Sequence, residues 1–359
     1  MWRVKSKWLR TVPLAVALCS TACLLIVVLS NNGYMHAGGQ IVFYLPEGST
    51  QKHPEQWSWQ SMSNHLELGR RQYLQPLPYI LNVEDLCYGN STQNFTNDSV
   101  DLLFLVSSAV QKFAHRKAIR DSWGRDVSAY GNNRLAFLLG SPNDTISQSG
   151  IESEHALHSD IIQGNFSDTY RNVTIKSAMM LHWTTKYCRG VRFLVKVDDD
   201  TYVNIPNLIE TLRAEQRTDA IFGMLYRSTS PIRSLDSKWY VTVEEYPSDK
   251  YPDYVGGAAY AIGGRVLDLL YNATGVVKPF SMEDAYITGT CAEHVGIPRV
   301  LLRGVSTLKL SSVCEHKNAI AGHYVSPSEM VILWNALQRT VLSCHYVIFN
   351  WYFCNCAAR

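Results

Sequence analysis

The sequence predicts an α/β domain built on a mostly parallel sheet, with one apolar segment near the N-terminus. From residue 100 onward, short apolar runs of the buried-strand type alternate with stretches of helical periodicity. This alternation is typical of a parallel sheet that carries helices on both faces. Residues 12–29 are almost wholly apolar, and a polar tract separates them from the alternating region. The chain of 359 residues is long enough for one large domain plus such accessory segments.

The apolar segment is predicted to be a transmembrane signal-anchor over residues 11–30. About 18–20 residues at a rise of about 1.5 Å each just span a hydrocarbon layer of about 30 Å. Only basic charges precede the segment, at Arg3, Lys5, Lys7 and Arg10. Residues 1–10 are therefore expected in the cytosol, with the rest of the chain across the membrane. The alternative is a cleaved signal peptide, but the segment exceeds the usual apolar core of about 7–15 residues, and residues 31–34 fit a cleavage site poorly.

Features of an oxidising lumen follow the apolar segment. Seven N-glycosylation sequons occur, at Asn90, Asn94, Asn97, Asn143, Asn165, Asn172 and Asn272. Seven of the nine cysteines also lie beyond the segment, at Cys87, Cys188, Cys291, Cys314, Cys344, Cys354 and Cys356. These cysteines are expected to form disulfides, and their odd number leaves at least one thiol free or paired with another chain. The sequence therefore permits a homo- or hetero-oligomer that is linked through the odd cysteine.

Residues 31–98 are predicted to form a stem, and residues 99–359 a single folded domain. The stem holds scattered Gly, Pro, Gln, Ser and Asn with little periodicity, which is typical of an extended spacer. Short ordered pieces are expected within it near residues 79–87. The net charge of +2 gives no reason to expect nucleic acid as a partner of either part.

The folded domain is predicted from its elements in chain order. Strands are expected at residues 100–106, 134–139, 191–197 and 220–225, and helices at residues 113–123, 172–187 and 205–216. Ligands of such sheets bind at the carboxyl ends of the strands. Chemistry is therefore expected just after Val106 and just after Val197.

An acidic triplet, Asp198-Asp199-Asp200, directly follows the third predicted strand. Adjacent carboxylates repel one another unless a cation neutralises them. Because side chains alternate along a strand, Asp198 and Asp200 are expected to point to the same side. Oxygen ligands beside a diphosphate suit Mg²⁺ or Mn²⁺. Taken alone, such a triplet is more often a solvated turn or a helix start. An EF-hand calcium loop does not fit, because its Asp-Gly and its late Glu are missing.

Seven blocks of the sequence occur in the same order as in a known family. They are HRKAIRDSW (His115–Trp123), FLLG (Phe137–Gly140), DIIQGNFSDTYRNVTIKS (Asp160–Ser177), FLVKVDDDTYVN (Phe193–Asn204), YPDYVGGAAY (Tyr251–Tyr260), MEDAYITG (Met282–Gly289) and GHYVSPSEM (Gly322–Met330). Together they resemble the β-1,3-glycosyltransferases, the family of β-1,3-galactosyl- and N-acetylglucosaminyltransferases. The resemblance extends over residues 100–344. Two departures, Ala259 for a Gly and Ala285 for a Val, border the expected acceptor site.

The resemblance implies a GT-A fold and an inverting hexosyl transfer from a UDP-sugar, with Mn²⁺ or Mg²⁺ as cofactor. It also implies a type II protein of the Golgi membrane, with residues 99–359 as the lumenal catalytic domain. Family frequency favours galactose from UDP-galactose, transferred to a glycan on lipid or protein. UDP-GlcNAc or UDP-GalNAc is the alternative donor, because no residue separates the three. A non-catalytic lumenal chaperone or lectin-like binder on the same fold is the alternative from another class, and it would be expected to lose the triplet or Asp284.

The resemblance assigns the metal ligands and the general base. The metal is expected on Asp198, Asp200 and His323, and the base is expected to be Asp284. His323 is otherwise an ordinary loop histidine. Glu283-Asp284 is otherwise the cap of a helix over residues 286–294, and this role is compatible with catalysis.

Donor and acceptor residues are predicted around these groups. The donor is expected on Ser107, Arg116, Arg120, Lys196 and Asp199. The two arginines share one helix face at i, i+4 and suit phosphate, although a structural salt bridge is the alternative. The acceptor is expected on Trp239, Tyr254, Gly256, Gly257 and Glu283. Aromatic faces commonly line sugar sites, and glycines at a turn allow close approach, although about half of the aromatic residues there are expected to be packing residues.

Overall fold

The structure is a computed structural model that describes residues 36–37, 40–41, 71–88 and 100–338. The chain divides into two compact units, residues 1–66 and residues 67–359. In the first unit, β1 (His36–Ala37) pairs antiparallel with β2 (Gln40–Ile41). The predicted tail and anchor at residues 1–30 lie outside the described residues. Across the described ranges, no helix has both the length and the apolar composition to cross a membrane.

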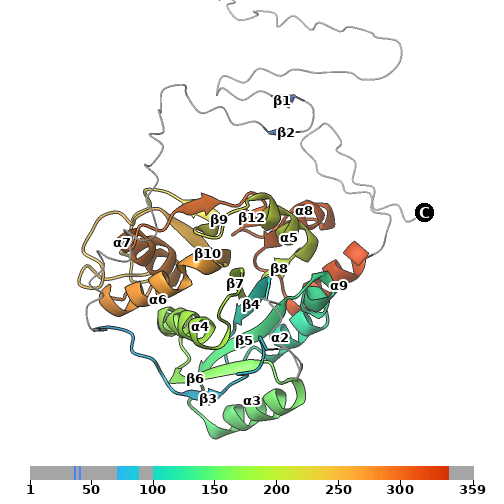
Figure 1. Cartoon of the computed structure of the whole chain (residues 1–359), viewed down its shortest axis with the longest axis horizontal. Coiled ribbons are helices and arrows are strands. Elements are labelled where there is room, and N and C mark those ends of the chain that lie inside the picture. Colours follow the sequence, from blue (N-terminus) through green and yellow to red (C-terminus); the bar gives the residue numbers. More distant parts are fainter. Residues whose placement is uncertain (1–35, 38–39, 42–70, 89–99, 339–359) are drawn as a thin grey trace, which may run out of the picture. The chain divides into compact units, whose positions relative to one another are not determined.

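An eight-stranded sheet forms the centre of the second unit, in the order β11-β9-β10-β7-β4-β5-β6-β3 (Figure 1). Its strands are β3 (Tyr79–Leu81), β4 (Leu102–Ser107), β5 (Arg134–Ser141), β6 (Ile161–Ser167), β7 (Phe193–Asp198), β9 (Ile221–Tyr226), β10 (Tyr254–Gly263) and β11 (Arg299–Leu301). Strands β6, β5, β4 and β7 run parallel, whereas β3 and β10 are antiparallel to their neighbours. The predicted mostly parallel α/β sheet is confirmed.

Helices cover both faces of this sheet. They are α2 (Phe113–Arg120), α3 (Thr145–His158), α4 (Val173–Tyr187), α5 (Ile205–Ala214), α6 (Leu267–Val276), α7 (Ala292–His294), α8 (Val313–Asn318) and α9 (Pro327–Gln338). Short 3₁₀ helices span Trp123–Tyr130, Tyr170–Asn172 and Gly264–Val266, and a π-helix spans Ala285–Cys291.

The strands are apolar on both sides because each face meets helices. Along β4, Leu102, Phe104 and Val106 join the core that includes α2, α5 and α9. Leu103 and Leu105 alternate with them and are also fully buried. They face the side on which α4 packs with α6 (Figure 1). A continuous apolar run such as residues 102–106 therefore marks a strand buried on two faces.

A small second sheet, in the order β12-β13-β8, joins distant parts of the chain. It consists of β8 (Tyr202–Val203), β12 (Val305–Ser306) and β13 (Ala321–Gly322). Antiparallel pairing of β13 with β8 places Gly322 opposite Tyr202. The residues that follow the acidic triplet are thereby fixed against the residues that precede His323.

Residues 71–88 belong to the second unit, although the sequence places them in the stem. Strand β3 pairs with β6, and the Arg71 guanidinium donates to the Tyr271 carbonyl and the Thr274 hydroxyl of α6. The predicted ordered piece near residues 79–87 is present, and the folded domain starts before residue 99. The sequence hid these contacts, because the partners of β3 and of Arg71 lie far along the chain and leave no periodic signal at residues 71–88.

A disulfide joins Cys87 to Cys188 across 101 residues of sequence. Cys314 is also disulfide-bonded, and Cys291 is a buried free thiol. The expectations of disulfides and of at least one free thiol are both met by described residues. The free thiol belongs to the last residue of the π-helix.

Removing the Cys87–Cys188 bond is expected to destabilise the domain. A cross-link that closes a loop of about 100 residues stabilises a fold by up to about 4.7 kcal/mol, and loss of a native disulfide typically costs about 2–5 kcal/mol. Cys87→Ser with Cys188→Ser should therefore lower the urea midpoint of the full-length chain. An unfolding midpoint unchanged from wild type would contradict the structural role of this bond.

Candidate active site

A cleft of about 600 Å³ lies where β4, β7 and β10 meet the loops at their ends. This volume is within the range of about 300–1,000 Å³ that is usual for ligand sites. Its lining includes six carboxylates, from Asp168, Asp198, Asp199, Asp200, Glu283 and Asp284. The carboxyl ends of β4 and β7 thus supply the chemistry, as the sheet topology predicts.

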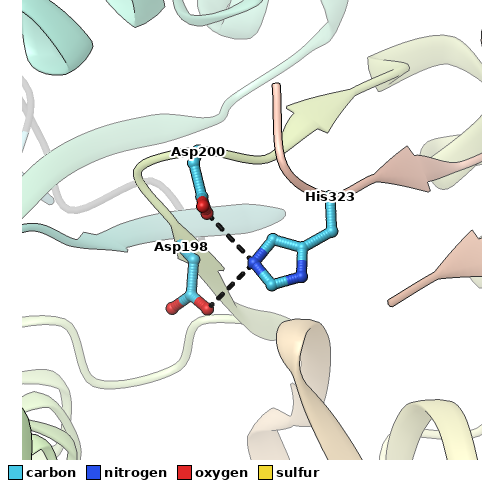
Figure 2. A group of neighbouring side chains, drawn as sticks. All are labelled: Asp198, Asp200 and His323. Atoms are coloured by element: carbon cyan, nitrogen blue, oxygen red, sulfur yellow. Dashed lines mark ion pairs between the residues drawn. The ribbon is translucent and has the colours of Figure 1, made fainter. Parts of the chain in front are cut away.

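Asp198, Asp200 and His323 converge in this cleft, as Figure 2 shows. One ligand atom from each lies within 4.8 Å of the others. The His323 Nε2 atom is 3.1 Å from Asp200 Oδ1 and 3.9 Å from Asp198 Oδ2. His323 Nδ1 is 3.2 Å from the Thr307 carbonyl oxygen and donates to it when protonated, and this contact turns the other ring nitrogen, Nε2, toward the two aspartates. Two carboxylates and an imidazole are a donor set that fits Mn²⁺ or a similar divalent cation.

Pairing of β13 with β8 explains why a histidine 123 positions after Asp200 reaches it. Gly322 pairs with Tyr202, and the Val325 amide donates to the Asp200 carbonyl at 2.8 Å. His323 lies between these two backbone contacts and therefore faces the triplet. Burial opposes the charge of His323, but its hydrogen bond to Asp200 outweighs burial and raises the pKa of the imidazole.

Asp198 uses its two oxygens in different directions. Oδ2 faces His323, whereas Oδ1 accepts from Lys196 Nζ at 2.5 Å. The same ammonium donates to the Gly257 carbonyl at 2.5 Å and lies 3.9 Å from Glu283 Oε2. Burial opposes the charge of Lys196, but Asp198 and Glu283 outweigh it and raise the pKa of the ammonium. Lys196 therefore ties the metal site to the β10 backbone and to Glu283.

Asp199 points away from Asp198 and Asp200, as predicted, although it lies in the turn that follows β7. Its carboxylate is 8% exposed and accepts from the Ser108 hydroxyl at 2.8 Å and the Ala109 amide at 3.4 Å. Burial raises the pKa of this carboxyl group. Asp199 thus anchors the loop after β4, next to Ser107, which also lines the cleft.

Asp284 lies at the start of the π-helix and lines the cleft. Its Oδ2 accepts from the Gly257 amide at 3.0 Å, and its Oδ1 accepts from the Ala285 amide at 2.9 Å. Burial and the adjacent Glu283 raise the pKa of Asp284 to about 6. The helix-cap role and a carboxylate with a raised pKa therefore coexist in one side chain.

Strand β10 carries three of the five predicted acceptor residues, Tyr254, Gly256 and Gly257, and this corrects one prediction. Residues 256–257 were expected in a turn, but they lie inside the ten-residue strand Tyr254–Gly263, whose pairing with β9 shifts register between Val255 and Tyr260. The segment GGAA lacks the alternation and bulk that mark a strand, so the sequence disguised it. Pairing of β10 with β7 then sets Ala259 opposite Val197, which brings the glycines beside the triplet.

All five predicted acceptor residues line the cleft. They are Trp239, Tyr254, Gly256, Gly257 and Glu283. Trp239 is 39% exposed, whereas Glu283 is buried and accepts from the Tyr260 hydroxyl at 2.7 Å. A methyl group on Gly256 would come within 2.7 Å of the Tyr226 ring, so this glycine permits the ring to pack against β10. Tyr254 is mainly a packing residue, because its ring stacks on Tyr226 and is 8% exposed.

Arg116 and Arg120 do not face the cleft, which corrects their assignment to the donor. Arg116 is fully buried, with Nη2 2.6 Å from Glu154 Oε2. Arg120 pairs with Glu154 at 2.7 Å and with Asp160 at 2.8 Å. Helical spacing put the two arginines on one face correctly, but their partners lie 34–40 positions away and carried no local signal. Arg116 still serves the site indirectly, because it donates to the Ala109 carbonyl at 2.8 Å.

Arg120→Ala is expected to reduce stability and leave nucleotide binding intact. Removing one partner of a buried ion pair typically costs about 3–5 kcal/mol, because the other charge stays buried and unpaired. Urea unfolding of the full-length chain should show this loss, and the Kd for UDP at a temperature where the variant is folded should stay within about twofold of wild type. Normal stability with much weaker UDP binding would restore Arg120 to the donor site.

Two features of the site escaped the sequence reasoning. Lys176 and Asp168 form a buried pair at 2.8 Å, and Lys176 also donates to the Ser108 carbonyl at 2.6 Å. Both residues fall in the block Asp160–Ser177. An acid and a lysine eight positions apart in that block are the signal that could have indicated an ion pair. Tyr170 also lines the cleft, and burial, followed by Asp284 and Asp198, raises its pKa to about 12.

Comparisons with known proteins agree with this geometry. A sequence model of the family described as Galactosyltransferase matches residues 114–303. Beta-1,3-galactosyltransferase 5 of Homo sapiens is 33% identical over 245 residues, which cover 67% of this chain and 79% of that protein. The Pan paniscus protein of the same name is 33% identical over 243 residues, covering 66% of this chain and 80% of that protein.

Beta-1,3-galactosyltransferase 1 of Mus musculus is 32% identical over 243 residues, covering 66% of this chain and 74% of that protein. The matched family segment contains the acidic triplet, β10 and Asp284. His323 lies beyond it and is brought to the triplet by the small sheet. The chain therefore belongs to the galactosyltransferase family, as a hexosyltransferase of the β-1,3-glycosyltransferase type.

Proposed function

We propose that this chain transfers galactose from UDP-galactose, with inversion, to a hydroxyl of a glycolipid or glycoprotein glycan, and forms a β-1,3 linkage. The observation that carries the proposal is that the Asp198–Asp200–His323 triad and Asp284 line one cleft. The relatives' names support the donor and the linkage. We further infer a GT-A fold and a Golgi type II topology, with residues 1–10 cytosolic, residues 11–30 spanning the membrane and the folded domain lumenal.

Asp284 is the general base of the proposed reaction. Its carboxylate takes the proton of the acceptor hydroxyl, whose oxygen attacks the anomeric carbon while the bond from that carbon to the UDP oxygen breaks. The Gly257 and Ala285 amides hold the carboxylate in place, and Glu283 beside it is a candidate acceptor ligand. The buried Tyr260 donates its hydroxyl hydrogen to Glu283 at 2.7 Å and so fixes the residue beside Asp284.

Asp198, Asp200 and His323 would hold the divalent cation, Mn²⁺ or Mg²⁺. Such an ion supplies positive charge that stabilises a diphosphate leaving group. Lys196 keeps Asp198 Oδ1 engaged, so that Oδ2 is left for the cation. Asp199 and Ser108 fix the loop after β4, where the nucleotide is expected.

Glycosylation is proposed at the exposed sequons among the described residues. Asn143 and Asn165 are exposed. Asn172 is half-buried and donates to the Ser167 carbonyl at 2.8 Å, and the hydroxyl residue of the Asn272 sequon, Thr274, is fully buried. Asn90, Asn94 and Asn97 lie outside the described residues.

The acid limb of the rate profile is expected near pH 6. Because the pKa of Asp284 is raised to about 6, the base is ionised above that pH and protonated below it. The value of kcat/KM for transfer should level off above about pH 6 and fall about tenfold per unit below it. The Kd for UDP over the same range separates this loss from loss of the donor. A kcat/KM that stays flat to pH 5 would contradict Asp284 as the base.

A donor screen tests the proposal as a whole. Purified full-length chain in detergent is given UDP-galactose, UDP-GlcNAc or UDP-GalNAc with Mn²⁺ and a panel of glycan acceptors, and the product linkage is determined. We expect galactose in a β-1,3 linkage. Efficient transfer of either N-acetylhexosamine instead would overturn the donor, and a different linkage would overturn the regiochemistry.

A further inference from the structure

A diphosphate brought to the triad enters a cleft with more acids than bases. Six carboxylates line it, against four lysines, Lys112, Lys176, Lys196 and Lys238. A nucleotide diphosphate needs cations that are not already neutralised, because each charge-assisted hydrogen bond to phosphate must outweigh repulsion from the acids. The ion pairs of the four lysines therefore decide which of them are available.

Two of the four lysines are committed to carboxylates. Lys176 Nζ is 2.8 Å from Asp168 Oδ1, and Lys196 Nζ is 2.5 Å from Asp198 Oδ1. Both lysine side chains are no more than 3% exposed, so neither can turn to a ligand without breaking its pair. The arginines of α2 are likewise bound to Glu154 and do not line the cleft.

Lys112 is exposed and is not ion-paired to any described carboxylate. It lies in the loop between β4 and α2, and its amide donates to the Ala109 carbonyl at 3.0 Å. The Ala109 amide in turn contacts Asp199, which is next to the metal-ligand candidate Asp200. Lys112 Nζ is 3.4 Å from His115 Nε2. Lys112 lines the same cleft as the triplet, and its ammonium has further hydrogens available for a ligand.

Lys238 is held in the cleft by aromatic rings instead of acids. Its Nζ lies 4.7 Å from the centre of the Trp239 ring, 5.8 Å from Tyr324 and 5.9 Å from Tyr170. Cation–π contacts position an ammonium without neutralising its charge. The Tyr324 ring stacks on His323 with centroids 3.9 Å apart, so this ammonium is held on the metal-triad side of the cleft.

Resting on the proposed UDP-sugar reaction, we propose that Lys112 and Lys238 bind the diphosphate of the donor, in the role that the sequence suggested for Arg116 and Arg120. Lys112 lies in the loop after β4, and Lys238 lies in the loop after β9. In the sheet, β4 and β9 are on opposite sides of β7, the strand that ends at Asp198. As the bond to the anomeric carbon breaks, negative charge grows on the diphosphate, and two unneutralised ammonium groups stabilise it.

Binding of UDP and of uridine to the full-length chain tests this inference. Titration calorimetry with Mn²⁺ compares wild type with Lys112→Ala, Lys238→Ala, Lys112→Arg and Lys238→Arg. Lys117→Ala is the matched control, because this lysine lies on the same loop-helix segment, is 74% exposed and does not line the cleft. Each alanine variant should weaken UDP binding about tenfold, the arginine variants should restore most of it, and uridine binding should not change.

Each result has one meaning. UDP binding that stays within twofold of wild type in a folded alanine variant overturns the role of that lysine. If Lys238→Ala leaves UDP binding unchanged and raises only the KM for the acceptor, the inference is overturned for Lys238, and this lysine is assigned to acceptor binding instead. Equal weakening of uridine and UDP also overturns the inference, since uridine has no phosphate. Failure of the proposed function would give a different result, because the wild-type chain itself would then bind no UDP.

Discussion

Asp284→Asn is expected to lower kcat for sugar transfer by about 10²–10⁴-fold, the usual contribution of a positioned general base. The substitution keeps the size of the side chain and removes its ability to take a proton. Because Asp284 accepts from the Gly257 and Ala285 amides, asparagine would keep one of these hydrogen bonds through its single oxygen. The residual rate should also lose the acid limb near pH 6, since the group responsible for it is gone.

Binding measurements separate this loss from misfolding. Asp284 makes no contact with the metal triad in the described structure, so the Kd for UDP with Mn²⁺ should stay within about twofold of wild type. The thermal midpoint should also stay close to wild type or rise, because a buried carboxyl group with a raised pKa is replaced by a neutral amide. Near-native turnover in a folded variant would remove Asp284 from the mechanism.

Asp200→Asn is expected to weaken metal-dependent donor binding by at least about 10–100-fold. Asp200 Oδ1 is 3.1 Å from His323 Nε2, so the substitution removes an anionic ligand and the partner that orients the imidazole. Loss of an outer-sphere partner alone typically costs about 10–100-fold in metal affinity, and loss of a direct ligand should cost at least as much. Transfer should fall in proportion at limiting Mn²⁺ and recover only partly when Mn²⁺ is raised.

Asp121→Asn is the matched control for this experiment. Asp121 is exposed, pairs with Lys117 and does not line the cleft. It should leave the Mn²⁺ dependence of the rate unchanged. If Asp200→Asn retains the wild-type Mn²⁺ dependence, the cation does not bind at the triad.

The parts of the fold that follow from local pattern could be predicted from the sequence. Apolar runs gave the strands now seen as β4, β5, β7 and β9 to within two residues at most ends, because a strand buried on both faces needs an unbroken apolar run. Alternation along β7 also separated Asp198 and Asp200 from Asp199, which turns to Ser108.

Features that depend on distant partners were hidden. Strand β10 is built of GGAA beside apolar residues, and only its pairing with β7 and β9 makes it a strand. Arg116 and Arg120 share a helix face, but the sequence does not say that Glu154 and Asp160 come to meet them. His323 reaches Asp200 through the two-residue strand β13, which is too short to leave a periodic signal.

The position of His323 came instead from resemblance to a family. The role of Asp284 also came from the resemblance, because the residues around it fit the start of a helix equally well. The structure adds the link between them, in which Lys196 joins Asp198 to the Gly257 carbonyl while the Gly257 amide holds Asp284. Asp198 and Asp284 are thus linked through Lys196 and through Gly257 of the neighbouring strand β10.

The Mn²⁺ dependence of UDP binding to the wild-type chain tests the central claim most directly, namely that a cation on Asp198, Asp200 and His323 holds the donor. UDP is titrated into the full-length chain in Mn²⁺ and again in EDTA, with the His323→Ala variant alongside. We predict binding in Mn²⁺ that is lost in EDTA and greatly weakened in the variant. Equal affinity for UDP in Mn²⁺ and in EDTA, or an unchanged Mn²⁺ response in His323→Ala, would contradict the account.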